Sequence, residues 1–267
     1  MLEALTGVRY LLIDLDGCMY RGEQLTEGAK EAIELLKKRG INYLYLTNNS
    51  TKSPREFAEK LSRLGVLAKA EEIFTSAQAT VLYMERLERK PIYVVGSSYL
   101  KQQLLERGFS LVEEDKAELA GYVVVGLDFQ LTYQKLAAAC LAIQRGAEFI
   151  ATNPDPNLPL EDHYLPGAGS IVSAIAVATG VKPLVIGKPS KIIVNLALKK
   201  LRARKRESAI VGDRLDTDIR AGKAAGIKTI LLSHGAILPS LEKTRVKPDF
   251  VVNSLLSLAE RLGGGSP

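Results

Sequence analysis

The sequence of 267 residues has only two cysteines, Cys18 and Cys140, and no long apolar run. Two cysteines argue against a fold held together by disulfides. No apolar stretch is long enough to span a bilayer, and no basic segment leading into a hydrophobic stretch opens the chain. We therefore expect a cytoplasmic protein without a membrane partner, long enough to bury a sizeable core in one or two domains.

Aromatic residues are also missing from the most basic part of the chain, where stacking on bases would require them. The net charge is +6, and much of it comes from Lys199, Lys200, Arg202, Arg204, Lys205 and Arg206. A nucleic-acid patch is one interpretation of this cluster. Cations at the negative end of a helix dipole are the stronger interpretation, so we expect no nucleic-acid partner. An excess of positive charge also suits an enzyme of anionic substrates.

The hydrophobic pattern alternates between short apolar runs and amphipathic stretches, which is typical of α/β proteins with parallel sheets. Predicted strands cover residues 10–14, 41–47, 92–95, 122–125, 148–151, 184–186, 209–211, 229–232 and 250–252. Predicted helices cover residues 27–39, 54–64, 77–88, 99–107, 132–145, 171–179, 191–201 and 216–225. Residues from about 77 to 183 contain an alternation of their own, which favours a second domain inserted into the first.

Two aspartates, Asp14 and Asp16, follow the first apolar run and precede Gly17. Residues i and i+2 of a strand point to the same side, so both carboxylates can face one small volume at the carboxyl end of the strand. Like charges held that close repel unless a cation or a chemical task offsets the repulsion. The pair therefore indicates a metal-assisted site in which one aspartate acts as nucleophile or as acid and base.

Three more polar motifs stand at the ends of predicted strands, at residues 47–50, 187–190 and 212–218. If their strands are neighbours of the first, all four motifs meet at one edge of the sheet. Together they supply a phosphoryl-transfer site, because a transferring phosphate needs neutralised oxygens and an in-line nucleophile. Thr47 offers a hydroxyl, Asn48 a backbone N–H and Lys188 a positive charge. Asp14 and Asp213 offer the carboxylate oxygens that Mg²⁺ prefers.

Each motif alone has an ordinary structural interpretation. Aspartates after a strand form turns, and a run of Thr, Asn and Ser before Pro54 is typical of a helix N-cap. Lys188 before a proline resembles a solvated loop lysine, and acidic residues near position 216 can cap the helix that follows. The order of all four motifs and their placement at strand ends favour the chemical interpretation.

The combination resembles the haloacid dehalogenase superfamily of phosphotransferases. It is most similar to the NagD-like subfamily, which contains p-nitrophenylphosphatase-like enzymes, sugar phosphatases, pyridoxal phosphatase and phosphoglycolate phosphatase. The stretches that carry the resemblance are residues 14–22, 47–50, 151–155, 166–170, 187–190 and 212–218. The resemblance implies a Rossmann-like parallel-sheet core made of residues 1–77 and 184–267. It also implies that residues 78–183 form an inserted α/β cap domain that closes over the site and chooses the substrate.

The resemblance also implies catalytic and metal-binding roles. Asp14 is the expected nucleophile that forms an aspartyl-phosphate, and Asp16 is the expected acid and base for the leaving oxygen and for water. Asp14, the backbone carbonyl of Asp16 and Asp213 are the expected ligands of Mg²⁺. Asp218 is expected to orient the metal's surroundings through water, and Lys188 is expected to offset the charge of the nucleophile and phosphate.

Six residues are expected to bind the substrate: Thr47, Asn48, Asn49, Asn153, Asp155 and His163. Asn153 and Asp155 follow a predicted strand of the inserted segment, and His163 lies in a loop where a plain surface role is the alternative. His234 is expected to stabilise a core loop, and the Gly-rich tail at residues 263–267 is expected to be disordered.

The resulting hypothesis is a magnesium-dependent phosphomonoesterase of small phosphorylated metabolites, such as sugar phosphates, phosphoglycolate or pyridoxal phosphate, and a homodimer formed through the cap. A dehalogenase of the same fold needs neither Asp16 nor Asp213, so these residues argue against it. A phosphomutase uses the same aspartyl-phosphate, and the large cap after the second motif favours the phosphatase. A phosphoaccepting receiver domain is shorter and carries its phosphorylated aspartate on a later strand. A catalytically silent metabolite-binding protein stays open as an alternative.

Overall fold

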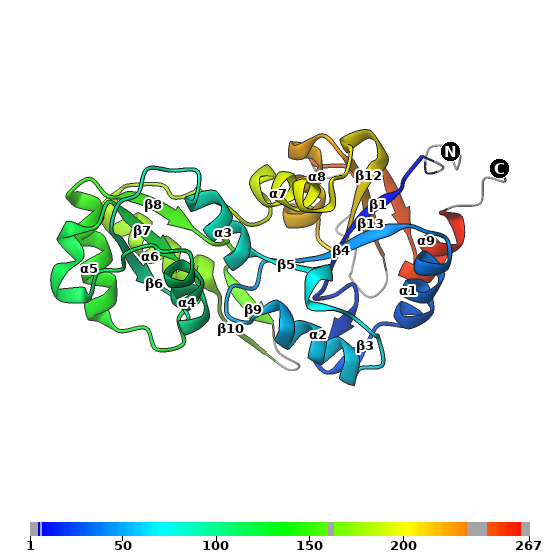
Figure 1. Ribbon diagram of the computed structural model, residues 1–267, viewed down its shortest axis with the longest axis horizontal. Coiled ribbons are helices and arrows are strands. Elements are labelled where there is room, and N and C mark those ends of the chain that lie inside the picture. Colours follow the sequence, from blue (N-terminus) through cyan, green and yellow to red (C-terminus); the bar gives the residue numbers. More distant parts are fainter. Residues whose placement is uncertain (1–4, 6, 160–162, 234–244, 263–267) are drawn as a thin grey trace. The chain divides into compact units, whose positions relative to one another are not determined.

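The structure is a computed structural model that describes residues 5, 7–159, 163–233 and 245–262 (Figure 1). His234 and the tail at residues 263–267 lie outside the described residues. The chain divides into two compact units, each with its own sheet. Unit 1 comprises Met1–Thr47, Pro54–Phe74 and Lys188–Pro267, and unit 2 comprises Asn48–Ser53 and Thr75–Gly187.

Unit 1 is built on a six-stranded sheet in the order β14-β13-β12-β1-β4-β5. Its strands are β1 (Tyr10–Asp14), β4 (Asn42–Thr47), β5 (Ile73–Thr75), β12 (Ser208–Gly212), β13 (Lys228–Leu232) and β14 (Phe250–Val252). Strand β1 runs parallel to both of its neighbours, and Leu12 lies opposite Leu44 of β4 and Ile210 of β12. The parallel α/β core predicted from the alternating pattern is therefore confirmed.

Helices and a small hairpin complete unit 1. The helices are α1 (Ala29–Lys38), α2 (Pro54–Arg63), α7 (Lys191–Leu201), α8 (Arg220–Ala225) and α9 (Leu255–Arg261), with 3-10 turns at Ala70–Glu72 and Lys205–Glu207 and a π-helical turn at Leu215–Ile219. The hairpin pairs β2 (Tyr20–Arg21) with β3 (Gln24–Leu25). Helix α1 shows why these segments dock on the sheet, since its buried residues Ala29, Ala32, Ile33 and Leu36 recur at helical spacing.

Unit 2 has a four-stranded parallel sheet in the order β11-β8-β7-β6. These strands are β6 (Ile92–Val95), β7 (Tyr122–Val125), β8 (Glu148–Ala151) and β11 (Leu184–Val185). The helices of unit 2 are α3 (Ser76–Met84), α4 (Ser98–Glu106), α5 (Tyr133–Gln144) and α6 (Ala168–Thr179), with a 3-10 segment at Glu114–Leu119. A two-stranded hairpin, β9 (Asn157–Pro159) with β10 (Tyr164–Pro166), lies between β8 and α6 in the sequence.

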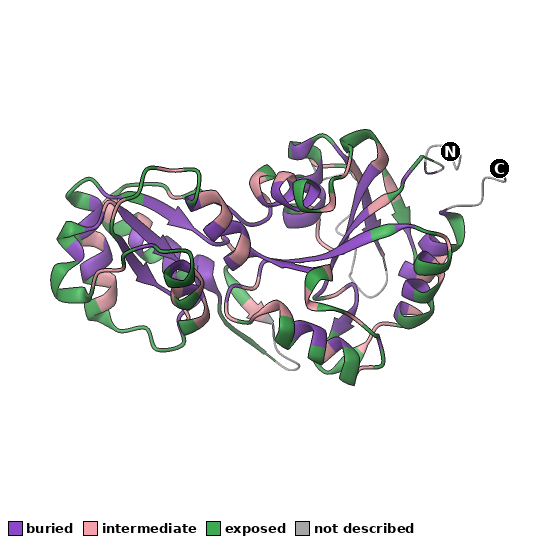
Figure 2. Ribbon diagram, viewed as in Figure 1, coloured by how far each residue is buried: buried purple, intermediate pink, exposed green. Residues whose placement is uncertain are grey.

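The central strands of both sheets are buried, as the near-continuous apolar runs of the sequence predict (Figure 2). Leu11, Leu12 and Ile13 of β1 are fully covered, and so are Val123, Val124 and Val125 of β7. Among the described residues no helix is both long enough and apolar enough to cross a membrane. The polar residues that stand out are those at the strand ends, where a buried strand passes into a loop.

Candidate active site

Two aspartates meet at the carboxyl edge of the unit 1 sheet. Asp14 is the last residue of β1, and Asp213 directly follows β12, which pairs with β1 in parallel. Asp14 is only 6% exposed although it carries a carboxylate. Neighbouring parallel strands thus bring the first and fourth sequence motifs together, at the edge where open α/β sheets bind ligands.

Lys188 joins this edge from the segment just before α7 and is itself buried. Its Nζ lies 2.5 Å from Oδ1 of Asp14 and 2.6 Å from Oδ1 of Asp218, and it donates to the carbonyl of Leu46 at 3.5 Å. The interpretation of Lys188 as a solvated loop lysine therefore does not describe this protein. Asp218, which the family resemblance implied would orient the metal's surroundings, is the second carboxylate partner of the lysine.

Burial and mutual repulsion set the protonation of these groups. Burial raises the pKa of Asp14 well above its usual range, the charge on Asp218 raises it further, and Lys188 opposes both. Burial also raises the pKa of Asp213 to about 6, again with a contribution from Asp218. For Lys188 burial acts to lower the pKa, but the two carboxylates outweigh it and leave that pKa above the ordinary lysine value. The lysine is therefore a fixed positive charge.

The carboxylates at this edge fit a divalent metal ion. Ligand atoms of Asp14, Cys18 and Asp213 lie within 4.8 Å of one another. Oδ1 of Asp213 is buried and has no hydrogen-bond partner among the described residues, which is costly unless a cation binds there. Burial raises the pKa of the Cys18 thiol, so the two carboxylates are the groups suited to a hard cation.

Two glycines that the sequence reasoning left without a role make room for the carboxylates. A side chain at Gly17, whose φ is +87°, would overlap the carboxylate of Asp213. A side chain at Gly212 would overlap Asp218 in the same way. Their place inside the first and fourth motifs could have predicted this role, because a glycine beside a functional residue often allows another group to approach the backbone closely.

Asp16 is exposed, in contrast to the buried Asp14 two residues before it. It lies in a turn between β1 and β2, which the backbone closes by hydrogen bonds from Met19 N to Leu15 O at 2.9 Å and from Gly17 N to Tyr20 O at 2.9 Å. The turn carries Asp16 beyond the end of the strand. Its place therefore depends on the turn and on the hairpin that follows.

The second motif spans the boundary between the two units in the sequence. Thr47 is buried at the end of β4, and Asn48 is the next residue along the chain. The side chain of Asn48 donates to Oδ2 of Asp155 at 2.8 Å, and its carbonyl accepts from Ser76 Oγ at 2.5 Å and from Asn153 Nδ2 at 2.7 Å. Unit 2 thus brings together three of the predicted substrate-binding residues.

The two other predicted substrate-binding residues have separate places. The side chain of Asn49 accepts from the backbone N and the hydroxyl of Thr51, at 2.8 and 2.9 Å, which forms a local turn. His163 is exposed, directly before β10. Their contact with substrate stays a prediction.

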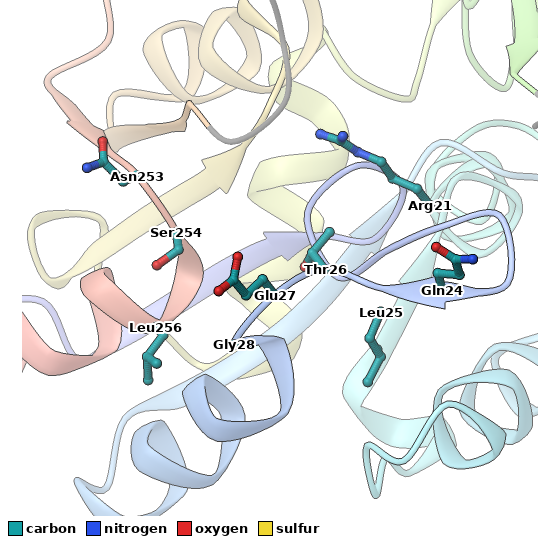
Figure 3. Close-up of a pocket in the computed structure, with 9 residues that line it drawn as sticks. All are labelled: Arg21, Gln24, Leu25, Thr26, Glu27, Gly28, Asn253, Ser254 and Leu256. Atoms are coloured by element: carbon teal, nitrogen blue, oxygen red, sulfur yellow. The ribbon is translucent and has the colours of Figure 1, made fainter.

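Unit 1 also contains an open cavity of about 530 Å³ (Figure 3). Its lining comes from the β2–β3 hairpin, the segment that leads into α1, and the segment that runs from β14 into the first turn of α9: Arg21, Gln24, Leu25, Thr26, Glu27, Gly28, Asn253, Ser254 and Leu256. None of these residues belongs to the acidic cluster, so the cavity is a neighbour of the hairpin and not the site described above.

Two family models match the chain, haloacid dehalogenase-like hydrolase over residues 11–110 and HAD-hydrolase-like over residues 185–258. Hydrolases of this family generally use a divalent metal. Acid sugar phosphatase of Staphylococcus saprophyticus is 43% identical over 253 residues, which cover 94% of this chain and 96% of that protein.

Solved structures agree with these matches. The 4-nitrophenylphosphatase of Thermotoga maritima aligns with a TM-score of 0.89 at 36% identity, covering 96% of this chain and 98% of that one. NagD of Escherichia coli K-12 aligns with a TM-score of 0.87 at 31% identity, covering 93% and 97%. A chain that resembles these phosphatases over nearly its whole length belongs to their family, the haloacid dehalogenase-like hydrolases, and within it to the NagD-like phosphatases.

Proposed function

We propose that the protein is a magnesium-dependent phosphomonoesterase that works through a phosphorylated Asp14. The observation that carries the proposal is the buried ion pair of Asp14 with Lys188, 2.5 Å apart, together with a buried oxygen of Asp213 that has no hydrogen-bond partner within the described part of the chain. A carboxylate held at a strand end next to a fixed cation is oriented for attack on an anionic phosphorus centre. The membership of the chain in a phosphatase family supports the same reaction.

The reaction has two steps. In the first, a carboxylate oxygen of Asp14 forms a bond to phosphorus while the bond from phosphorus to the leaving oxygen breaks. Asp16, in its protonated form, gives that oxygen its proton. In the second step a water molecule gives a proton back to Asp16 and attacks phosphorus, and the bond to Asp14 breaks. Inorganic phosphate leaves, and both aspartates regain their initial forms.

Asp14 and Asp213 would hold Mg²⁺ with their carboxylates, and Asp16 with its backbone carbonyl. When bound, the ion supplies positive charge that offsets the negative charge of the phosphoryl oxygens. Lys188 adds a second cation and neutralises the nucleophile before attack. Asp218 keeps Lys188 in place through its bond of 2.6 Å to Nζ. Thr47 and Asn48 would donate to the phosphoryl oxygens by a hydroxyl and a backbone N–H.

Substrate selection is the proposed task of residues 78–183, as a cap domain. Asn49, Asn153, Asp155 and His163 are the proposed contacts for the substrate. The substrate class is a small phosphorylated metabolite, with sugar phosphates first because the relatives at 43–44% identity are named acid sugar phosphatases. We further propose a cytoplasmic homodimer formed through the cap.

The test is hydrolysis by the purified protein of p-nitrophenyl phosphate and of a panel of phosphorylated metabolites, ranked by kcat/KM. We expect turnover of p-nitrophenyl phosphate that EDTA abolishes and added Mg²⁺ restores. Turnover that survives EDTA would refute the magnesium requirement. A protein that releases phosphate from no member of the panel would refute the proposed function.

A further inference from the structure

The backbone of Tyr20 forms part of the turn that carries Asp16. Asp16 and Tyr20 form an isolated β-bridge. The carbonyl of Tyr20 accepts from Gly17 N at 2.9 Å, and its own N–H donates to Leu15 O at 3.3 Å. A displacement of Tyr20 therefore moves the two residues on either side of the aspartate.

The ring of Tyr20 packs into the buried core of unit 1, and Lys60 of α2 contacts it from outside the hairpin. Tyr20 is only 1% exposed, and Nζ of Lys60 lies 3.9 Å from the centre of its ring. The side chain of Lys60 is 14% exposed, so most of its water has been removed, which strengthens the attraction between the ammonium and the ring. Glu23, at the tip of the same hairpin, lies 3.3 Å from Nζ. Helix α2 thus contacts the hairpin at two residues, Tyr20 and Glu23, both through Lys60.

One side of the hairpin borders a cavity, and Thr26, which follows the hairpin, donates its hydroxyl to the carbonyl of Cys18 at 2.5 Å. Gln24 and Leu25 of β3 line the cavity of about 530 Å³, together with Arg21 of β2 (Figure 3). A two-stranded hairpin is marginally stable by itself, so its position depends on the contacts of its buried residue. Tyr20 is that residue, and Lys60 is the cation against its ring.

We propose that Lys60 is a positioning residue for Asp16 and acts through the ring of Tyr20. The inference rests on the proposed function, in which Asp16 protonates the leaving oxygen. A misplaced acid harms the departure of a basic alkoxide most, because that oxygen cannot leave without a proton. p-Nitrophenolate is a stable anion and needs little protonation, so its release tolerates a misplaced acid.

The experiment compares Lys60→Met with Lys60→Arg on two substrates, p-nitrophenyl phosphate and a sugar phosphate that the wild type hydrolyses. For Lys60→Met we expect kcat/KM, which reports the step that forms the phosphorylated Asp14 and releases the leaving oxygen, to fall about tenfold more for the sugar phosphate than for p-nitrophenyl phosphate. Lys60→Arg keeps a cation over the ring and should recover most of the loss. Lys60→Gln, which keeps a donor for Glu23 but no charge over the ring, is a second variant should Lys60→Met fold poorly.

Lys200→Met is the matched control, because Lys200 lies over Phe74 in the same unit, with its Nζ 5.6 Å from the ring centre. We expect equal, small effects of this variant on both substrates. Equal losses of kcat/KM on both substrates in Lys60→Met, or no recovery in Lys60→Arg, would overturn the inference about Lys60 alone. A wild type that hydrolyses no phosphomonoester would instead overturn the proposed function.

Discussion

The two parallel sheets end in different polar environments. At the carboxyl edge of the unit 1 sheet, Asp14, Lys188 and Asp218 are buried charges in direct contact. The buried polar groups of unit 2 are mostly amides and hydroxyls, among them Asn48, Asn153 and those of Ser50 and Thr152. The one buried carboxylate among the described residues of unit 2, Asp128, has a single cation as its partner, Lys135 at 2.8 Å.

This difference suggests that the buried charges of unit 1 serve the reaction, whereas the buried amides and hydroxyls of unit 2 stabilise its structure. Buried charges cost folding free energy even when paired. A cluster of two carboxylates and a lysine, beside an Asp213 oxygen that has no partner in the described ranges, therefore needs a reason besides stability. The amides of unit 2 satisfy one another, as when Asn153 bonds to the carbonyl of Asn48. The charged cluster of unit 1 should therefore determine the rate of turnover, and the amide network of unit 2 should determine where its own side chains lie.

Replacing Asp14 by Asn should have the largest effect on turnover and is the strongest test of this comparison. We expect a loss of at least about a thousandfold in kcat for p-nitrophenyl phosphate, because the amide cannot attack phosphorus. Burial and Asp218 already disfavour the charge on Asp14, so the melting temperature of the metal-free variant should not fall below that of the wild type. Stopped-time phosphate release and thermal unfolding in EDTA measure the two effects.

Asp249→Asn is the control for that variant, since Asp249 also pairs with a lysine of unit 1, Lys223, but lies at the start of the β14 segment. It should lose some stability and keep its turnover. Full activity in Asp14→Asn would sink the assignment of the nucleophile, whatever its stability.

Asp213→Asn should show the next largest effect, on the metal. Its buried Oδ1 has no partner among the described residues, and an amide in that place is a weaker ligand for a hard cation. We expect the Mg²⁺ concentration for half-maximal activity to rise about 10- to 100-fold, with activity partly recovered at high Mg²⁺. An unchanged magnesium titration would argue that Asp213 is not a ligand.

Most strands of both sheets could be predicted from the sequence, because buried parallel strands are short, continuous apolar runs, but the three-residue strand β5 was not predicted. The predicted ranges 10–14, 92–95 and 122–125 coincide with β1, β6 and β7. The β2–β3 hairpin escaped prediction because two-residue strands carry no periodicity. The helix predicted at 216–225 begins with the π-helical turn Leu215–Ile219, a distortion for which helical spacing gives no signal.

The sequence predicted which strand ends carry the residues of the candidate site, but it did not predict which side chains bond to one another there. Asp14 and Asp213 lie close together because β1 and β12 are neighbours in the sheet, and the family resemblance of the four motifs implies that neighbourhood. The bond from Lys188 to Asp218 joins residues 30 positions apart, and the bond from Asn48 to Asp155 joins residues 107 positions apart. Such pairs depend on how loops fold back on a sheet, which propensity and periodicity do not determine.

The amide network of unit 2 should have a smaller effect, and the part of it that acts through Asn48 should be the same on every substrate. Asn153→Ala removes one of two side-chain donors from the carbonyl of Asn48, and Asp155→Ala removes the acceptor of its side chain. If these residues position Asn48 against the phosphoryl group, kcat/KM should fall about tenfold for p-nitrophenyl phosphate and sugar phosphates alike. Asp155→Asn keeps an acceptor and should recover most of the loss. Losses that vary from one leaving group to another would come from the direct substrate contact proposed for Asn153 and Asp155, whereas a uniform loss would come from the position of Asn48 alone.

Thr132→Ala should have the smallest effect, and it tells whether the network or the general stability of unit 2 matters. Thr132 caps α5 through a bond from Lys135 N to its hydroxyl at 3.2 Å, and no bond joins it to Asn48 or Asp155. Loss of such a cap costs about 1 kcal/mol, a size close to that of losing one buried hydrogen bond. We expect the melting temperature to fall by about 2–4 °C with kcat/KM unchanged. If Thr132→Ala lowers kcat/KM as much as Asn153→Ala does, the loss follows the general stability of unit 2. The claim that the amide network positions Asn48 would then be refuted.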